Sequence, residues 1–164
     1  MLSKRLDNIS PSVTVGISSK VKEMRANGID VISLSIGEPD FNVPERAKEY
    51  GKKSLDDNKT KYDFPAGILE LRQEICKKLK KENNIDYSPD QIVLSSGAKN
   101  SITNVLLVTT DPGSEVLLPL PYWVSYSEMV KVVNAVPVEV KTSKENNFKV
   151  TRENLLEAIT DKTR

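Results

Sequence analysis

The chain has 164 residues, of which 38% are hydrophobic and 29% charged, enough for one domain with its own core. Its 24 basic and 23 acidic side chains leave a net charge of +1, so the overall charge does not favour binding to nucleic acid. The absence of histidine excludes Ser-His-Asp and Cys-His catalysis and most transition-metal sites, and the single cysteine excludes an intrachain disulfide. Because no apolar leader or long apolar run occurs, we expect a cytoplasmic protein without a membrane partner.

The first third of the chain predicts an arm, a helix and a strand. Residues 1–12 are irregular in composition, and residues 13–27 favour a helix that Gly28 ends. The segment VISLSI at 31–36 alternates apolar and polar side chains, which predicts a short strand.

A glycine-proline turn and a second helix follow this strand. The turn begins at Gly37, where it either presents binding backbone or simply reverses the chain. Pro44 is expected to start the next helix at position N1, where proline is favoured, and this helix is expected to cover about 45–55.

The loop KTKYDFPAG at 59–67 carries two aromatic side chains where a simple connection would be polar. Tyr62 and Phe64 either pack the loop onto the body of the protein or serve a binding site. The clearest helix, over 68–84, follows, with Cys76 expected as a small core residue on its apolar side.

The segment IVLSSGAKNS at 92–101 predicts a buried strand, a glycine turn at Gly97 and a helix over 98–108. A helix entered through glycine directs free N–H groups and the positive end of its dipole toward the end of the strand. A phosphate group fits such a place, although the same turn also connects strands and helices that bind nothing. The sequence contains neither a P-loop nor a dinucleotide-binding glycine fingerprint.

A second strand over 115–118 leads through a proline-rich turn to Trp123 and a helix that extends to Val133. Open α/β sheets place their ligands beyond the carboxyl ends of strands, so Trp123 either presents a flat face for a ring or belongs to the core.

A third strand over 136–140 and a last helix over 152–160, with Thr151 as its N-cap, complete the chain. The alternation of strands and helices predicts an α/β layered fold with a largely parallel sheet.

Five segments, in order, closely resemble the N-terminal part of the class I aminotransferases: SIGEPDF, KTKYDFPAG, LSSGAKNS, DPGSEVLLPLPYWVSY and AITDKTR. These are fold-type I enzymes that depend on pyridoxal 5′-phosphate, and the resemblance is to their aspartate/aromatic branch. It implies a three-layer α/β/α fold with a mostly parallel sheet, incomplete in this chain. Residues 1–43 would form the N-terminal arm and part of the small domain, and residues 44–164 the first part of the large cofactor-binding domain.

The resemblance also implies roles for particular residues. The cofactor phosphate would be held by the backbone of Gly97, Ala98 and Lys99. Trp123 would lie against the pyridine ring and near the substrate, and the backbone of Gly37 would contact the substrate carboxylate. Tyr62 would reach across a homodimer interface to the phosphate of the neighbouring subunit.

The catalytic groups of the resembled family are expected outside this sequence. Lys59, Lys61 and Lys99 do not match the family's Schiff-base lysine, so we assign no catalytic residue here. In the family's sheet, strands that this sequence does not contain separate the one at 92–94 from the other two. We therefore expect the 164 residues alone to be inactive and not to hold the parent fold as a soluble monomer.

Two classes of function remain open. The first is part of an aminotransferase that moves an amino group between an amino acid, aspartate or an aromatic one, and a 2-oxo acid. The second is a non-catalytic α/β module that binds a phosphorylated ligand or a partner through Trp123 and Tyr62. Within the first class, a lyase or decarboxylase on the same scaffold is an alternative to the aminotransferase.

Overall fold

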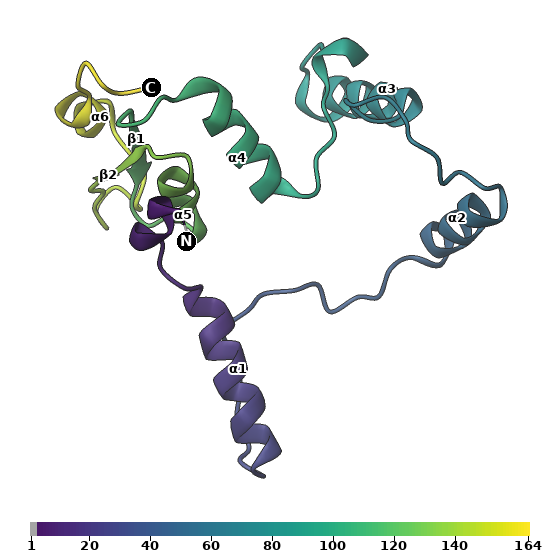
Figure 1. The fold of residues 1–164 in the computed structure, drawn as a ribbon, viewed down its shortest axis with the longest axis horizontal. Helices are drawn as coiled ribbons and strands as arrows, with labels where there is room; N and C mark the ends of the chain where they lie inside the picture. Colours follow the sequence, from purple (N-terminus) through teal and green to yellow (C-terminus); the bar gives the residue numbers. More distant parts are fainter. Residues whose placement is uncertain (1–2) are drawn as a thin grey trace. The chain divides into compact units, whose positions relative to one another are not determined.

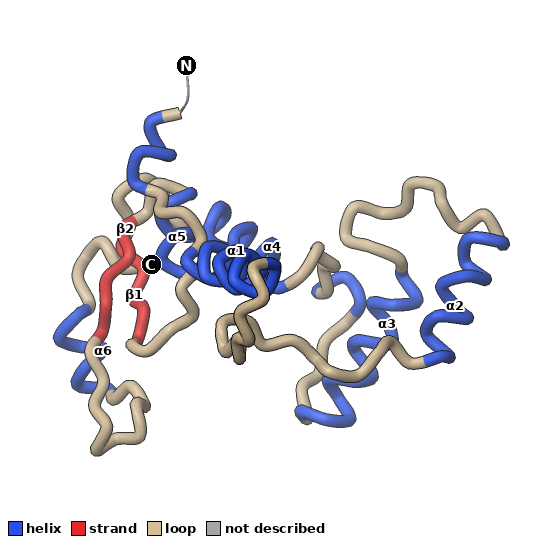
Figure 2. Tube along the Cα trace, turned by 90° about the horizontal axis from the view of Figure 1, so that it is seen from below, coloured by secondary structure: helices blue, strands red, loops and turns tan. Residues whose placement is uncertain are grey.

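A computed structural model describes residues 3–164, which form two compact units. One unit joins the segment up to Ile36 with Ser96–Arg164, and the other is Gly37–Ser95. Figure 1 follows the chain through both units, and Figure 2 distinguishes helices, strands and loops. The predicted domain boundary between residues 43 and 44 concerns the whole protein and stays a prediction.

The first unit contains a parallel β-α-β arrangement. Strand β1 (Glu115–Pro119) pairs in parallel with β2 (Val136–Val140), with Glu115 opposite Val136. Helix α5 (Ser125–Val132) connects the two strands and packs against both. Both strands and their parallel pairing confirm the sequence-based prediction.

The two edges of this small sheet differ. On the β1 side, Thr163 forms a parallel bridge with Glu115, and the N–H of Glu115 donates to the carbonyl of Lys162 (2.9 Å). On the β2 side, Pro137 lies between residues whose backbone groups face β1, so its nitrogen faces the outer edge. Proline is tolerated in a strand at such an edge because no ladder hydrogen bond is lost there.

The core of the first unit lies between α5 and α4 (Ala98–Thr109). Val130 is its most buried side chain, with only 1% of its surface exposed. The buried apolar cluster consists of Leu106, Met129, Val130, Val133 and Ala135, with Ile102 and Val116 packed against it.

Local capping begins and ends the outer helices of this unit. The N–H of Asn154 donates to the Thr151 hydroxyl (3.2 Å) at the start of α6 (Arg152–Ala158), as predicted. Helix α1 (Val13–Ala26) ends before Gly28, whose φ of 77° is the left-handed conformation that glycine favours at a helix end. A short 3₁₀ helix (Lys4–Asn8) precedes α1.

The second unit is organised around the buried side chain of Arg72. Its guanidinium donates to the carbonyls of Gly67 (3.0 Å) and Pro89 (2.8 Å) and lies 5.3 Å from the centre of the Phe64 ring. These contacts tie the loop before α3 and the turn after it to the helix itself. The helical elements are α2 (Glu45–Asp56), α3 (Leu69–Lys78), a π-helical turn (Leu79–Asn83) and a 3₁₀ turn (Pro89–Gln91).

Four sequence-based expectations differ from the structure. The segments 31–36 and 92–94 are not strands, although the backbone at Ile92 is extended. Alternating side chains indicate a two-sided segment, but a strand also needs a neighbouring strand, and within residues 3–164 the ladder joins β1 and β2. Pro44 is the N-cap of α2, one position before the predicted one. Cys76 is half-buried in α3.

No helix within residues 3–164 combines the length and the apolar composition that crossing a bilayer requires.

Candidate functional site

The turn before α4 adopts a conformation that requires glycine. Gly97 is the N-cap, with φ of 80° and ψ of 167°, and α4 begins at Ala98. A Cβ added at Gly97 would meet no atom within 4 Å, so glycine is needed here for backbone conformation and not for space. The predicted glycine turn at the start of a helix is confirmed.

This helix start leaves backbone donors free. The N–H of Ser101 makes the first backbone hydrogen bond of α4, to the carbonyl of Gly97 (3.3 Å), and no side chain caps the helix. Within the described part of the chain, the N–H groups of Ala98, Lys99 and Asn100 have no acceptor. Three free donors, the positive end of the helix dipole and the exposed ammonium of Lys99 together favour an anion.

A cavity of about 170 Å³ adjoins this helix start. It is lined by Ser10, Pro11, Ser12, Val13, Lys99, Val124, Ser125 and Glu128. The cavity therefore brings Lys99 together with the first residues of α5 and with the segment that precedes α1.

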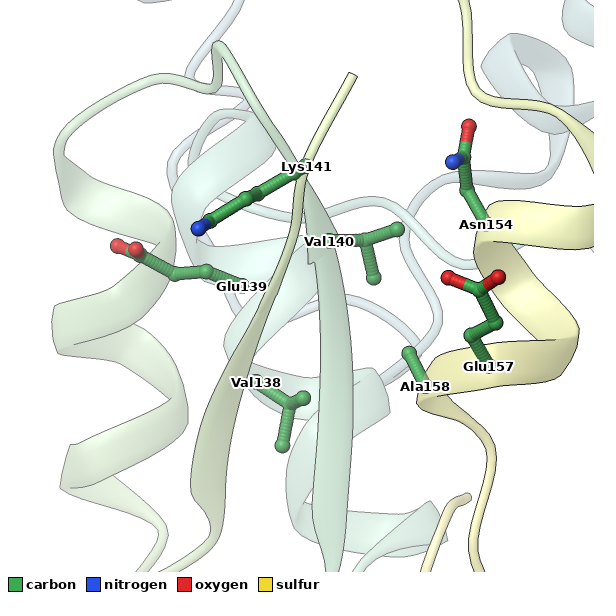
Figure 3. A pocket seen from close by; sticks show the side chains of 7 residues that line it. All are labelled: Val138, Glu139, Val140, Lys141, Asn154, Glu157 and Ala158. Carbon is green, nitrogen blue, oxygen red and sulfur yellow. The ribbon is translucent and has the colours of Figure 1, made fainter.

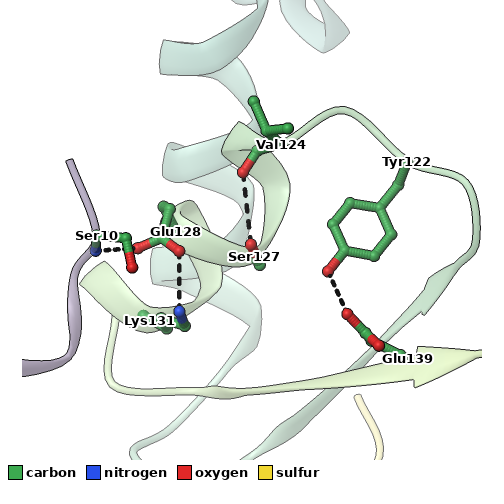
Figure 4. Close-up of polar contacts among 7 residues, drawn as sticks. All are labelled: Ser10, Tyr122, Val124, Ser127, Glu128, Lys131 and Glu139. Atoms are coloured by element: carbon green, nitrogen blue, oxygen red, sulfur yellow. Dashed lines mark hydrogen bonds and ion pairs between the residues drawn. The ribbon is translucent and has the colours of Figure 1, made fainter. Parts of the chain in front are cut away.

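Glu128 fastens that N-terminal segment to α5. The N–H of Ser10 donates to one carboxylate oxygen of Glu128 (2.9 Å), and the Lys131 ammonium donates to the other (2.8 Å) (Figure 4). The Lys131 bond lowers the pKa of Glu128 below its ordinary value, and the Ser10 bond acts in the same direction. Glu128 is thus an ionised, already paired carboxylate.

Trp123 lies just beyond the carboxyl end of β1, at the start of α5. Its side chain is 48% exposed, so the interpretation of Trp123 as a core residue is wrong. The N–H of Tyr126 donates to the Trp123 carbonyl (2.9 Å) as the chain enters the helix. Its neighbour Val124 lines the same cavity as Lys99. The stacking role of Trp123 stays a prediction.

Tyr122, which precedes Trp123, and Glu139 were not identified as site residues from the sequence. The Tyr122 hydroxyl donates to a carboxylate oxygen of Glu139 on β2 (2.9 Å) (Figure 4). Burial raises the pKa of Tyr122, and the bond to Glu139 acts in the same direction. The two residues are 17 positions apart, and only the parallel pairing of β1 with β2 brings them together.

The second unit carries the other two predicted site residues. The Tyr62 side chain is fully exposed and does not pack its loop onto its own unit, whereas Phe64 lies under the Arg72 guanidinium. Tyr62 lines an open surface hollow with Thr60 and Lys61. Gly37 is also exposed, and an added Cβ there would meet no atom within 4 Å.

A separate cavity of about 340 Å³ lies between β2 and α6 (Figure 3). It is lined by Val138, Glu139, Val140, Lys141, Asn154, Glu157 and Ala158, and none of the predicted site residues contributes to it. Over residues 3–164 there is no group of three or more His, Cys, Asp or Glu side chains placed to hold a metal ion.

Comparison with known proteins gives consistent matches over the whole chain. The family model described as aminotransferase class I and II matches residues 29–164. The aspartate aminotransferase of Bacillus sp. (strain YM-2) is 43% identical over 164 residues, which are 100% of this chain and 42% of that protein. The aspartate/prephenate aminotransferase of Cereibacter sphaeroides is 42% identical over 163 residues, 99% of this chain and 41% of that protein.

Solved structures agree. The aspartate aminotransferase from Thermus thermophilus with maleate matches with a TM-score of 0.95 at 41% identity, covering 100% of this chain and 43% of that one. The enzyme from Rhizobium meliloti gives a TM-score of 0.94 at 35% identity, covering 100% and 41%. The chain thus has the fold of the N-terminal segment of fold-type I aminotransferases and spans less than half the length of these relatives.

Proposed function

The chain belongs to the aminotransferase class I and II family, and from this premise we propose that the protein transfers an amino group between an amino acid and a 2-oxo acid with pyridoxal 5′-phosphate. The names of the relatives favour aspartate as the amino acid, and prephenate, which contains a 2-oxo acid group, as one acceptor. An aromatic amino acid is the alternative substrate, and a cytoplasmic location stays a prediction.

The observation that carries this proposal is the uncapped start of α4. Its free N–H groups, with the ammonium of Lys99, match the several acceptor oxygens and the negative charge of a phosphate ester. Gly97 supports the fit, since it is the N-cap of α4 and has no side chain that would cap those groups. The half-exposed ring of Trp123, whose neighbour Val124 lines the same cavity, offers a flat surface for a pyridine ring.

The cofactor, when bound, supplies an electron sink for the bond changes at the substrate Cα. In our proposal this chain binds and orients. The start of α4 and Lys99 hold the phosphate, Trp123 fixes the plane of the ring, and the backbone of Gly37 contacts the substrate carboxylate. Tyr62 donates its hydroxyl to the phosphate of a second subunit in a homodimer, which its full exposure permits. We assign the proton-relaying lysine to the part of the relatives that this chain does not cover.

The test compares two ligands that differ only in the phosphate. Binding of pyridoxal 5′-phosphate and of pyridoxal to the whole protein is followed by visible absorbance, for the parent, for Lys99→Met and for the exposed control Lys141→Met. We expect Lys99→Met to weaken only the phosphorylated ligand, by about tenfold, as for a bond to a charged group. Aspartate and a 2-oxo acid should then exchange the amino group.

The products distinguish the alternatives. Phosphate-dependent binding without amino transfer would favour a non-catalytic module, and release of carbon dioxide or an eliminated group would favour a decarboxylase or lyase. Equal affinity for both ligands in the parent protein would overturn the assignment of the α4 start as a phosphate site.

A further inference from the structure

The segment that carries Trp123 is fixed at its two ends and free between them. At its start, the N–H of Leu120 donates to the carbonyl of Val140 (2.9 Å), and the Thr142 hydroxyl donates to the carbonyl of Leu120. Its end is fixed by the bond from the Tyr126 N–H to the carbonyl of Trp123.

Between these ends the backbone has little support. Pro121 has no N–H, and within residues 3–164 the N–H groups of Tyr122 and Trp123 find no acceptor. Apart from the bond at the carbonyl of Trp123, backbone hydrogen bonds therefore do not set the direction in which Trp123 leaves the segment. Nor does packing alone, because about half of the Trp123 side chain is exposed.

One side-chain bond spans this unsupported stretch. Tyr122 is half-buried, and its hydroxyl donates to the Glu139 carboxylate on the neighbouring strand at 2.9 Å (Figure 4). A hydrogen bond to an ionised acceptor is stronger and more directional than one between neutral groups. A tyrosine hydroxyl is protonated at neutral pH, so this donor is present throughout the neutral range, and burial raises the pKa of Tyr122 further.

We propose that Tyr122 and Glu139 are positioning residues that hold Trp123 in the orientation in which it stacks on the cofactor ring. Tyr122 directly precedes Trp123, and its Cα lies about 3.8 Å from that of Trp123, so a bond that holds the Tyr122 side chain on β2 restrains the backbone from which Trp123 extends. Strand β2 thereby orients the Trp123 ring through Tyr122, although β2 makes no hydrogen bond with Trp123 itself. The inference rests on the proposed function of Trp123.

A merely structural role would predict something different. If the bond only stabilised the fold, its loss would lower the free energy of unfolding and would weaken cofactor binding equally with or without the indole. If it acts through Trp123, its loss has no further effect on binding once the indole is gone. A double-mutant cycle separates these two cases.

The experiment uses the whole protein with Tyr122→Phe, Glu139→Gln and Glu139→Ala, each alone and combined with Trp123→Ala. Tyr126→Phe is the matched control. It removes a tyrosine hydroxyl that lies three residues after Trp123 in the sequence and makes no hydrogen bond within residues 3–164. We expect Tyr122→Phe and Glu139→Ala to weaken pyridoxal 5′-phosphate by about threefold to tenfold, the size of one net hydrogen bond. Glu139→Gln, which keeps an acceptor, should lose less, and the losses should vanish in the Trp123→Ala background.

A second readout requires no cofactor. The emission of Trp123 is taken in the cofactor-free protein as the difference between each variant and its Trp123→Phe counterpart. Tyr122→Phe and Glu139→Ala should raise its quenching by acrylamide and lower its anisotropy, whereas Tyr126→Phe should change neither.

The two readouts keep the inference and the proposed function apart. Unchanged Trp123 emission, or a binding loss that adds fully to that of Trp123→Ala, would overturn the positioning role. If Trp123→Ala itself leaves cofactor affinity and absorbance unchanged, the stacking function fails, and the emission still decides whether the bond holds the indole. Should Tyr122→Phe not fold, the comparison of Glu139→Gln with Glu139→Ala decides alone.

Discussion

Replacing Gly97 by alanine separates the shape of the α4 start from its charge. The φ of 80° and ψ of 167° at Gly97 lie in a region that is open essentially to glycine alone. Forcing another residue into such a conformation costs about 1–3 kcal/mol. No clash adds to this cost, because the new Cβ would have no atom within 4 Å.

The conformational cost of Gly97→Ala can appear either in stability or in ligand binding. Either the turn keeps its conformation and the free energy of unfolding falls by about 1–3 kcal/mol, or the backbone rotates and the N–H groups of Ala98 and Lys99 turn away from the ligand. If the whole cost appears in binding, affinity for pyridoxal 5′-phosphate falls by about fivefold to 150-fold. Affinity for pyridoxal, which lacks the phosphate, should not change.

The assay measures both quantities in the whole protein, by denaturant unfolding and by titration with the two ligands. Gly113→Ala is the matched control, since Gly113 has a φ of 87°, has equally open surroundings and lies in the turn before β1. It should lower stability without altering the ratio of the two affinities. If Gly97→Ala leaves both stability and that ratio unchanged, the reasoning about this turn is refuted.

Three further predictions follow from single contacts. Tyr62→Phe should weaken retention of pyridoxal 5′-phosphate by about 1.5–3 kcal/mol, because it removes a donor to a charged group; equal dissociation constants for variant and parent would contradict the intersubunit role. Since Lys131 holds the pKa of Glu128 below its ordinary 4.5, that pair stabilises the fold fully above pH 4.5 and less as the pH falls below it. Glu128→Gln should therefore lower the free energy of unfolding at neutral pH but not in acid, and an equal loss at both would exclude the ion pair as the cause. Val130→Ala should cost about 1.5–3 kcal/mol in denaturant unfolding, against almost nothing for the exposed Val108→Ala, and equal costs would place Val130 outside the core.

Features determined by neighbouring residues were predictable from the sequence. Thr151 caps α6, Gly28 ends α1 and Gly97 precedes α4, because each depends on the conformation of a few consecutive residues. The parallel pairing of β1 and β2 also followed, since a helix between two strands leaves them running the same way.

Features that depend on distant partners were not predictable. The segment 92–94 has the side chains of a strand, and the resemblance already implied that its neighbouring strands lie outside this sequence, so no ladder forms there within residues 3–164. The bond from the N–H of Leu94 to the carbonyl of Ala66, however, was not predicted. The bond between Tyr122 and Glu139 was also missed, because it exists only once two strands are paired in one register. At the candidate site, the sequence pointed to Gly97, Lys99 and Trp123 but not to Tyr122 and Glu139, whose bond joins residues 17 positions apart.

The two edges of the sheet differ in their capacity to accept a further strand. Strand β1, helix α5 and strand β2 are contiguous in sequence, so they close at a small entropic cost and are suited to form early. Pro137 removes a backbone donor from the outer side of β2, whereas the other side of β1 already accepts Thr163 as a partner. The β1 side is therefore the edge of this sheet that can accept a further parallel strand, whereas Pro137 disfavours pairing on the β2 side.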